Sequence, residues 1–183
     1  MTGAAQGLPA FLRAYYHHKS ADWPGNTPIP LAGWTAGELA KLPTYYVMDL
    51  AADMAATVAA EMPSADQIAA CRWLTEPELA VYVEEFARTG FQGGLNWYRC
   101  RFAPHLLAEQ QLFAGRTIDI PALFLAGRHD WGIQQSPGAL ARMRQHAFTN
   151  MGPPVLIDGA GHWVQQEQPA AVAAALLAFL GRA

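Results

Sequence analysis

The hydrophobic positions of residues 1–113 follow a helical period, and no stretch among them alternates convincingly as a half-buried strand would. Apolar side chains at positions 79, 82, 83 and 86 share one face of a predicted helix that ends at Gly90. An alanine-rich segment predicts a second helix within residues 49–61, which Pro63 ends. We therefore expect a helical first region, interrupted by a proline-rich loop at residues 23–30.

Three helix starts in this region carry a capping box. In this motif a Ser or Thr hydroxyl accepts a hydrogen bond from a backbone N–H, and a Glu or Gln three residues later reaches back. The pairs are Thr35 with Glu38, Ser64 with Gln67, and Thr75 with Glu78. They predict helices that begin directly after each hydroxyl residue.

The pattern changes after residue 113, where two short apolar runs alternate with two predicted helices. Residues 118–126 and 154–158 each indicate a short buried strand bounded by Gly or Pro. A helix is predicted from Pro137 to about residue 148, and another over residues 170–180. The order strand, helix, strand, helix predicts a parallel β-α-β-α unit with a right-handed crossover.

Composition narrows the class of protein. The chain has 183 residues, of which 52% are hydrophobic and 15% charged, so a disordered chain is excluded. The net charge of −3 and the lack of a basic stripe argue against a nucleic-acid partner. The longest apolar run, residues 170–180, is too short to span a membrane. The N-terminus has no secretory pattern, which predicts a cytoplasmic location.

The two cysteines, Cys71 and Cys100, lack CxxC spacing, which excludes a disulfide scaffold and a Cys-based zinc site. Two reduced thiols are favoured over a single bridge between them.

Asp130 and His162 each follow one of the predicted strands. Sites in open α/β sheets form beyond the carboxyl ends of parallel strands, so we expect these two side chains to meet there. An Asp that accepts from one imidazole nitrogen leaves the other free to act as a general base. Alone, each residue is more simply a turn carboxylate or a backbone-bonded loop histidine; their paired placement favours a functional dyad.

Three segments carry a resemblance to a known family. GFQGGLNWYR at residues 90–99, IPALFLAGRHD at residues 120–130 and AGHWVQQEQP at residues 160–169 resemble, in this order, the C-terminal part of an epoxide hydrolase of the α/β-hydrolase fold. The resemblance implies an incomplete α/β-hydrolase fold. Residues 1–113 would be the helical cap, and residues 114–183 the C-terminal part of the core.

The implied activity is hydrolysis of a small apolar epoxide to a vicinal diol through an Asp-ester intermediate, without a metal or organic cofactor. His162 would activate water, and Asp130 would orient the His162 ring. Tyr98 would donate a hydrogen bond to the epoxide oxygen. A phenol suits that role because ring opening develops alkoxide charge. Tyr98 could instead be a solvent-exposed aromatic at the rim of the pocket. A backbone break at residues 93–94 favours a side chain positioned for the reaction.

Trp163 and Trp131 flank the dyad and are predicted to bind substrate, with core or rim packing as the equal alternative. The family's second cap tyrosine is expected upstream of this chain. Tyrosines that could replace it are interpreted as helix-packing aromatics: Tyr15, Tyr16, Tyr45 and Tyr46.

The sequence contains no G-x-[SDC]-x-G elbow, which would carry the nucleophile, and no His-Gly-x-Pro oxyanion loop. Three explanations compete: a truncated piece of a longer enzyme, a half-enzyme completed by an N-terminal half on a partner chain, or a non-catalytic remnant. The truncated piece is favoured because the three side chains of the resemblance, Tyr98, Asp130 and His162, are all present.

A dehalogenase-like hydrolase is the alternative activity to an epoxide hydrolase. The exposed edge of residues 122–126 predicts self-association.

Overall fold

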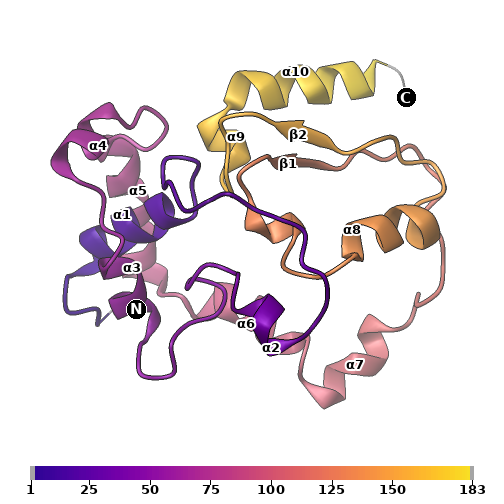
Figure 1. The fold of residues 1–183 in the computed structure, drawn as a ribbon, viewed down its shortest axis with the longest axis horizontal. Helices are drawn as coiled ribbons and strands as arrows, with labels where there is room; N and C mark the ends of the chain where they lie inside the picture. The colour runs from indigo at the N-terminus through magenta and orange to yellow at the C-terminus, as the bar shows by residue number, and fades with distance from the viewer. Residues whose placement is uncertain (1–2, 182–183) are drawn as a thin grey trace.

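Helices dominate the first region of the computed structural model, which describes residues 3–181. Within the described residues no strand precedes residue 125 (Figure 1). The helices are α1 (Leu8–His18), α2 (Ala36–Leu39), α3 (Met54–Ala59), α4 (Ala65–Ala70), α5 (Glu76–Thr89), α6 (Gln92–Cys100) and α7 (Pro104–Gln110).

The capping boxes start two of these helices as predicted. At α4 the Ser64 hydroxyl accepts from the Gln67 N–H, and the Gln67 side chain accepts from the Ser64 N–H. At α5 the Glu78 carboxylate accepts from the backbone N–H of Thr75, and the helix ends at Gly90, whose φ is 67°. At α2 the box is incomplete, because the Glu38 carboxylate accepts from Ala32 rather than from the cap residue.

Two helix predictions need correction. The helix expected within residues 49–61 covers only Met54–Ala59, because the Asp53 side chain accepts from the Ala56 N–H at 2.8 Å and starts the helix there. The break expected at Gly93 and Gly94 is wrong, since α6 continues through both glycines to Cys100. A helix interior tolerates glycine at a cost of about 1 kcal/mol per residue.

The second region is the predicted β-α-β-α unit, but its strands are short. The strands β1 (Leu125–Gly127) and β2 (Val155–Ile157) pair in parallel with Leu125 opposite Val155. The strand expected over residues 118–126 reduces to its last residues plus two isolated bridges, at Ile118 and Ala122. Pro121 lies between these bridges and cannot donate to a strand ladder.

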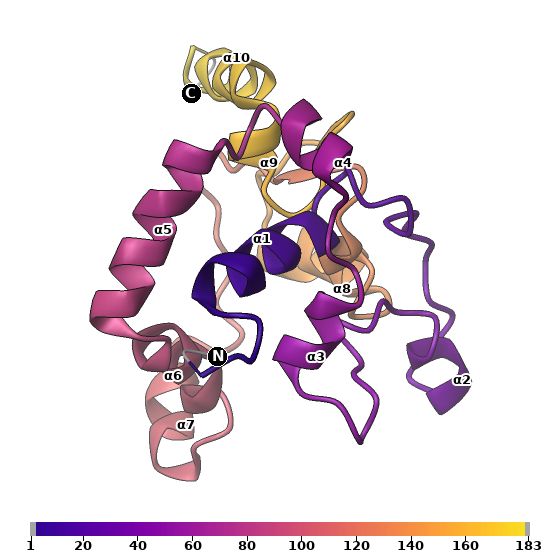
Figure 2. The same ribbon diagram turned by 90° about the vertical axis from the view of Figure 1, so that its left-hand side faces the viewer.

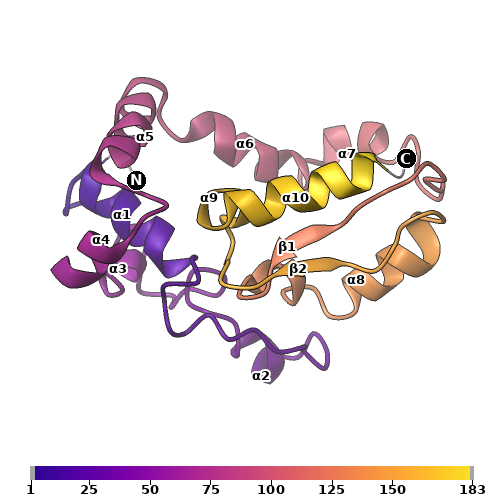
Figure 3. The ribbon, with the colours of Figure 1, turned by 90° about the horizontal axis from the view of Figure 1, so that it is seen from above.

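Short helices connect and follow the strands. The predicted helix between them is a 3₁₀ turn, η1 (Trp131–Ile133), then α8 (Ala139–Arg142) continuing as a π-helical turn, η2 (Met143–Ala147). After β2 come α9 (Val164–Glu167) and α10 (Pro169–Leu180). Figures 1 and 3 show α10 and α8 on opposite sides of the two strands. No helix within residues 3–181 is long and apolar enough to cross a membrane.

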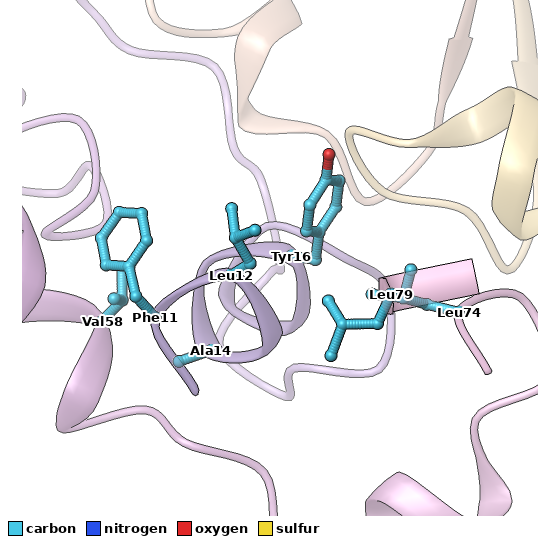
Figure 4. Close-up of a cluster of buried hydrophobic side chains, with 7 residues drawn as sticks. All are labelled: Phe11, Leu12, Ala14, Tyr16, Val58, Leu74 and Leu79. Carbon is cyan, nitrogen blue, oxygen red and sulfur yellow. The ribbon is translucent and has the colours of Figure 1, made fainter. Parts of the chain in front are cut away.

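The main hydrophobic core surrounds α1, which packs against α5 and α3 (Figure 2). Figure 4 shows Phe11 beside Val58 on one side of α1, and Leu79 with Leu74 on the other. Burying one Leu, Val or Phe side chain fully contributes about 1.5–3 kcal/mol to the free energy of folding. A second cluster joins both regions, because it packs Leu31, Leu42 and Tyr45 of the first region against Trp131 of the second.

The segment that follows α1 ties the two regions together. Its Lys19 carbonyl accepts from the His162 N–H at 2.9 Å, and its Ala21 N–H donates to the Glu167 carboxylate at 2.7 Å. The carbonyl of Asn26 lies 2.9 Å from Nδ1 of His129. These contacts hold the loops after β1 and β2 against the end of α1. Cys71 and Cys100 are both free thiols, as predicted.

Candidate active site

Asp130 lies in the turn directly after β1. Its Oδ1 accepts from the Gly132 N–H at 2.7 Å, so the carboxylate caps the 3₁₀ turn η1. Its own N–H donates to the carbonyl of Gly127. The carboxylate is therefore anchored at the carboxyl end of the strand, where the sequence predicted it.

His162 lies in the loop after β2, and close backbone approaches fix that loop. A Cβ at Gly127 would lie 2.1 Å from the Gly161 carbonyl oxygen, and one at Gly161 would lie 2.7 Å from the Lys19 carbonyl oxygen. Only glycine leaves room for both contacts. The loop consequently folds back over the end of β1 and directs His162 toward Asp130.

The two predicted side chains form a dyad. Nδ1 of His162 lies 3.2 Å from both carboxylate oxygens of Asp130, and within residues 3–181 its Nε2 makes no hydrogen bond. Burial raises the pKa of Asp130, but the hydrogen bond and charge of His162, the Gly132 N–H and the Lys19 charge outweigh it. The net pKa lies below the usual value, so the carboxylate stays ionised. This arrangement leaves Nε2 available as a general base.

Glu167 anchors the loop after β2 that carries His162, here called the histidine loop. This role of Glu167 is not predicted by the sequence. One carboxylate oxygen accepts from the backbone N–H groups of Ala21 and Gly161, at 2.7 and 2.9 Å, and the other accepts from Trp163 at 3.0 Å. Burial raises the pKa of Glu167 even though these donors favour the charged form. The residue is part of the third family-like segment, but nothing local in the sequence reveals contacts with residue 21.

A largely apolar cavity of about 430 Å³ opens between α1, α6 and Trp163 of the loop after β2. Its walls include Phe11 and Leu12 of α1, and Phe91 and Leu95 near the start of α6. Neither dyad residue lines this cavity, but Trp163 does, and its ring packs edge-on against the His162 imidazole at a centroid distance of 4.8 Å.

Tyr98 lies on α6 and lines the same cavity, with 63% of its surface exposed. Burial raises the pKa of Tyr15 to about 12, and the neighbouring Tyr98 contributes in the same direction. The structure thus brings Tyr98 to the cavity that Trp163 also lines, and within residues 3–181 its hydroxyl makes no hydrogen bond.

The two predicted substrate-binding tryptophans differ. Trp163 lines the cavity, and its Nε1–H donates to the Tyr16 carbonyl at 2.9 Å, which fixes the indole ring. Trp131 is 4% exposed in the second hydrophobic cluster and does not line the cavity. Its position corresponds to the alternative of core packing.

The tyrosines interpreted as helix-packing aromatics do more than pack. Tyr16 and Tyr45 are buried in the two hydrophobic clusters, but all four line the cavity: Tyr15, Tyr16, Tyr45 and Tyr46. Burial raises the pKa of each phenol, so each stays protonated near neutral pH. Tyr15 and Tyr16 lie on α1, whereas Tyr45 and Tyr46 lie in a turn between α2 and α3, so no helical period connects the two pairs.

No protein-family model matches the chain. Individual curated proteins do match it. The chain is 48% identical over 110 residues to Epoxide hydrolase A of Mycobacterium tuberculosis, an alignment that covers 59% of this chain and 32% of the relative. An epoxide hydrolase of Caballeronia sordidicola is 36% identical over 108 residues, with the same two coverages.

Solved structures agree. An epoxide hydrolase from an endophytic Streptomyces superposes with a TM-score of 0.67 at 23% identity, covering 96% of this chain and 46% of that one. Potato epoxide hydrolase I gives a TM-score of 0.56 at 27% identity over 68% of this chain and 39% of that one. The chain resembles the C-terminal part of α/β-hydrolase-fold epoxide hydrolases.

The matched epoxide hydrolases are longer than this chain. It spans about a third of the length of the curated relatives above and about half of the Streptomyces structure. The structural match extends over nearly the whole chain, so the helical first region shares the epoxide hydrolase fold as well.

Proposed function

We propose that this chain supplies the cap and the acid–base dyad of an epoxide hydrolase, which converts an epoxide and water to a vicinal diol. The observation that carries the proposal is the pairing of His162 with Asp130, together with Trp163, which packs against the His162 ring and lines a cavity that Tyr98 also lines. Residues 1–113 act as the cap and residues 114–183 as the end of the hydrolase core.

In the proposed reaction a carboxylate opens the oxirane and forms an ester with one ring carbon. The Tyr98 hydroxyl donates to the oxygen that leaves the ring, which develops alkoxide charge. Nε2 of His162 then takes a proton from water, and the resulting hydroxide attacks the ester carbonyl. Asp130, held ionised by its hydrogen bonds, stabilises the imidazolium. Collapse breaks the ester C–O bond, and the imidazolium returns its proton to the departing alkoxide. The new carboxylic acid loses its proton, which balances the one taken up by the oxygen of the opened ring, so the diol is released and the carboxylate is regenerated.

The attacking carboxylate requires an elbow motif, which these 183 residues do not contain. We propose that it belongs to a hydrolase core segment joined to this chain or provided by a partner chain. Supporting this, the His162 loop is hydrogen-bonded to Lys19 of the first region, and the His162 side chain is 34% exposed.

A chimaera tests the proposal. Residues 1–183 would replace the matching C-terminal part of Epoxide hydrolase A of M. tuberculosis, and hydrolysis of styrene oxide would be compared with that of a chloroalkane. We expect diol formation from the epoxide, no halide release, and a loss of about 10²–10⁴-fold in kcat for Tyr98→Phe or His162→Ala.

The matched control is His105→Ala, because His105 is exposed on α7 and does not line the cavity. Its chimaera should retain full turnover. A folded chimaera that turns over halide instead, or that is indifferent to His162→Ala, would refute the proposed function.

A further inference from the structure

Lys19 directly follows α1 and is buried at the junction of the two regions. Its carbonyl accepts from the His162 N–H, while its side chain lines the cavity and only 8% of the residue is exposed. The mechanism above makes no use of this ammonium group.

Aromatic rings surround the ammonium. Nζ of Lys19 lies 5.2–5.7 Å from the ring centroids of Tyr15, Tyr45, Tyr46 and Trp163. Within the described residues it makes no hydrogen bond and no salt bridge; the other lysine, Lys41, pairs with Glu38 on the surface. Ring faces attract a cation but offer no acceptor oxygen.

Burial lowers the pKa of Lys19 to about 8, an effect that the charge of Asp130 partly opposes. Asp130 itself is hydrogen-bonded by His162 and Gly132 and does not contact the ammonium. Lys19 is therefore still mainly charged at neutral pH. Buried charges in folded proteins are normally paired and hydrogen-bonded, and this one lacks a partner where it borders the cavity.

We propose that Lys19 is an anion-binding group of the cavity and that its ligand is a compact carboxylate with an apolar body. The apolar walls accommodate the body of such a ligand, and one ammonium matches one carboxylate. No arginine lines the cavity to balance a phosphate dianion.

This inference deepens the proposed function and rests on it for the substrate class. Trp163 contacts both groups, since its ring lies 4.8 Å from the imidazole of His162 and 5.7 Å from Nζ of Lys19. A carboxylate at Lys19 would thus lie close to the reacting ring. The substrate class then includes short epoxy acids, whose carboxylate would lie near the oxirane, in addition to uncharged epoxides.

The chain offers a direct probe, because Lys19 and Lys41 are its two lysines. NMR of protein labelled with ¹³C at the lysine ε position gives one signal for each. Adding 3-phenylpropanoate should shift the Lys19 signal and raise the pKa of Lys19 toward its ordinary value, while Lys41 stays unchanged. The neutral 3-phenylpropanamide should leave both signals in place.

Calorimetry with the same two probes completes the test. Lys19→Met should weaken carboxylate binding by about tenfold or more, as expected for loss of a charge-assisted contact, whereas Lys41→Met should not change it. The inference is overturned if the carboxylate does not bind, if it binds no better than the amide, or if Lys19→Met binds it equally well. If Lys19→Met fails to fold, the NMR titration of the unmodified protein still tests whether the carboxylate binds at Lys19.

Neither probe contains an epoxide, so the outcome is separable from the hydrolase activity. Carboxylate binding without turnover by the chimaera would retain the anion site and reject the proposed function. Turnover of styrene oxide without carboxylate binding would reject the anion site alone.

Discussion

The helical region around α1 and the strand-containing region after residue 114 differ in how much apolar surface each one buries. Seven buried side chains on α1, α3 and α5 and the loop before α5 form a continuous cluster. After residue 114, the buried hydrophobic residues in the described chain are Ala126, Trp131 and Ala160. The first region carries its own core, whereas the second depends on what it contacts.

The apolar helix α10 shows the difference most clearly. Leu177 and Leu180 are 70% and 65% exposed, although the helix is made almost entirely of Ala, Leu, Val and Phe. Such a helix is normally buried on all sides. The dyad lies between the two regions and depends on both: its carboxylate and imidazole come from the second, and its loop is held by the segment after α1.

The largest effect should come from the α1 core. Leu12 is 2% exposed, so Leu12→Ala should lower the free energy of unfolding by about 2–5 kcal/mol. Leu177→Ala, the same chemical change at a 70% exposed position, should alter it by less than about 0.5 kcal/mol. Urea unfolding followed by circular dichroism measures both. Equal losses would show that the two regions do not differ in burial.

The next effect concerns Glu167, which joins the regions. Glu167→Ala leaves three backbone N–H groups without their acceptor and should cost about 1–3 kcal/mol. Amide hydrogen exchange should rise at residues 21, 161 and 163 and stay unchanged within α5. Glu84→Ala, at an exposed position of α5, is the control. Unchanged exchange at residues 161 and 163 would argue against a clamp.

A smaller effect should appear in the pH dependence of stability. Burial lowers the pKa of Lys19 to about 8 in the folded state from 10.5. Between these values the unfolded chain binds more protons, so this group makes the folded state more stable as pH rises from 8 toward 10.5. The gain should be about 3 kcal/mol and be lost in Lys19→Met. Parallel profiles for the two proteins would contradict a buried ammonium.

The smallest effect should be on association. We expect the isolated chain to self-associate at micromolar concentration, because one edge of β1 and the leucines of α10 are uncovered. Replacing Leu176, Leu177 and Leu180 by Ser should lower the weight-average mass measured by light scattering. A clean monomer of the unmodified chain would refute this expectation.

The sequence predicts the dyad well because local signals mark it. Asp130 and His162 each follow an apolar run, and parallel strands bring such positions to one edge. The strand over residues 118–126 is overestimated, because apolar character says nothing about the partner that would pair with it. Here the described chain offers only β2.

Contacts between residues far apart in the sequence escaped prediction. Glu167 meets Ala21 across 146 positions, and the cage of Lys19 combines tyrosines from two segments with Trp163. The periodicity of hydrophobic positions in the sequence does not indicate contacts between residues so far apart. Trp131 illustrates another limit: a tryptophan suits a core and a pocket wall equally, and only the packing with Leu31 and Tyr45 distinguishes them.

We propose that His162 and Asp130 hydrolyse an ester formed when a carboxylate opens an epoxide. Intact-mass spectrometry of the chimaera carrying His162→Asn, after brief exposure to styrene oxide, tests it most directly. Without the general base the ester should persist, and the protein should gain the mass of one styrene oxide in nearly every molecule. A folded His162→Asn chimaera that gains no mass, or that still releases diol at the rate of the unmodified chimaera, would contradict the account.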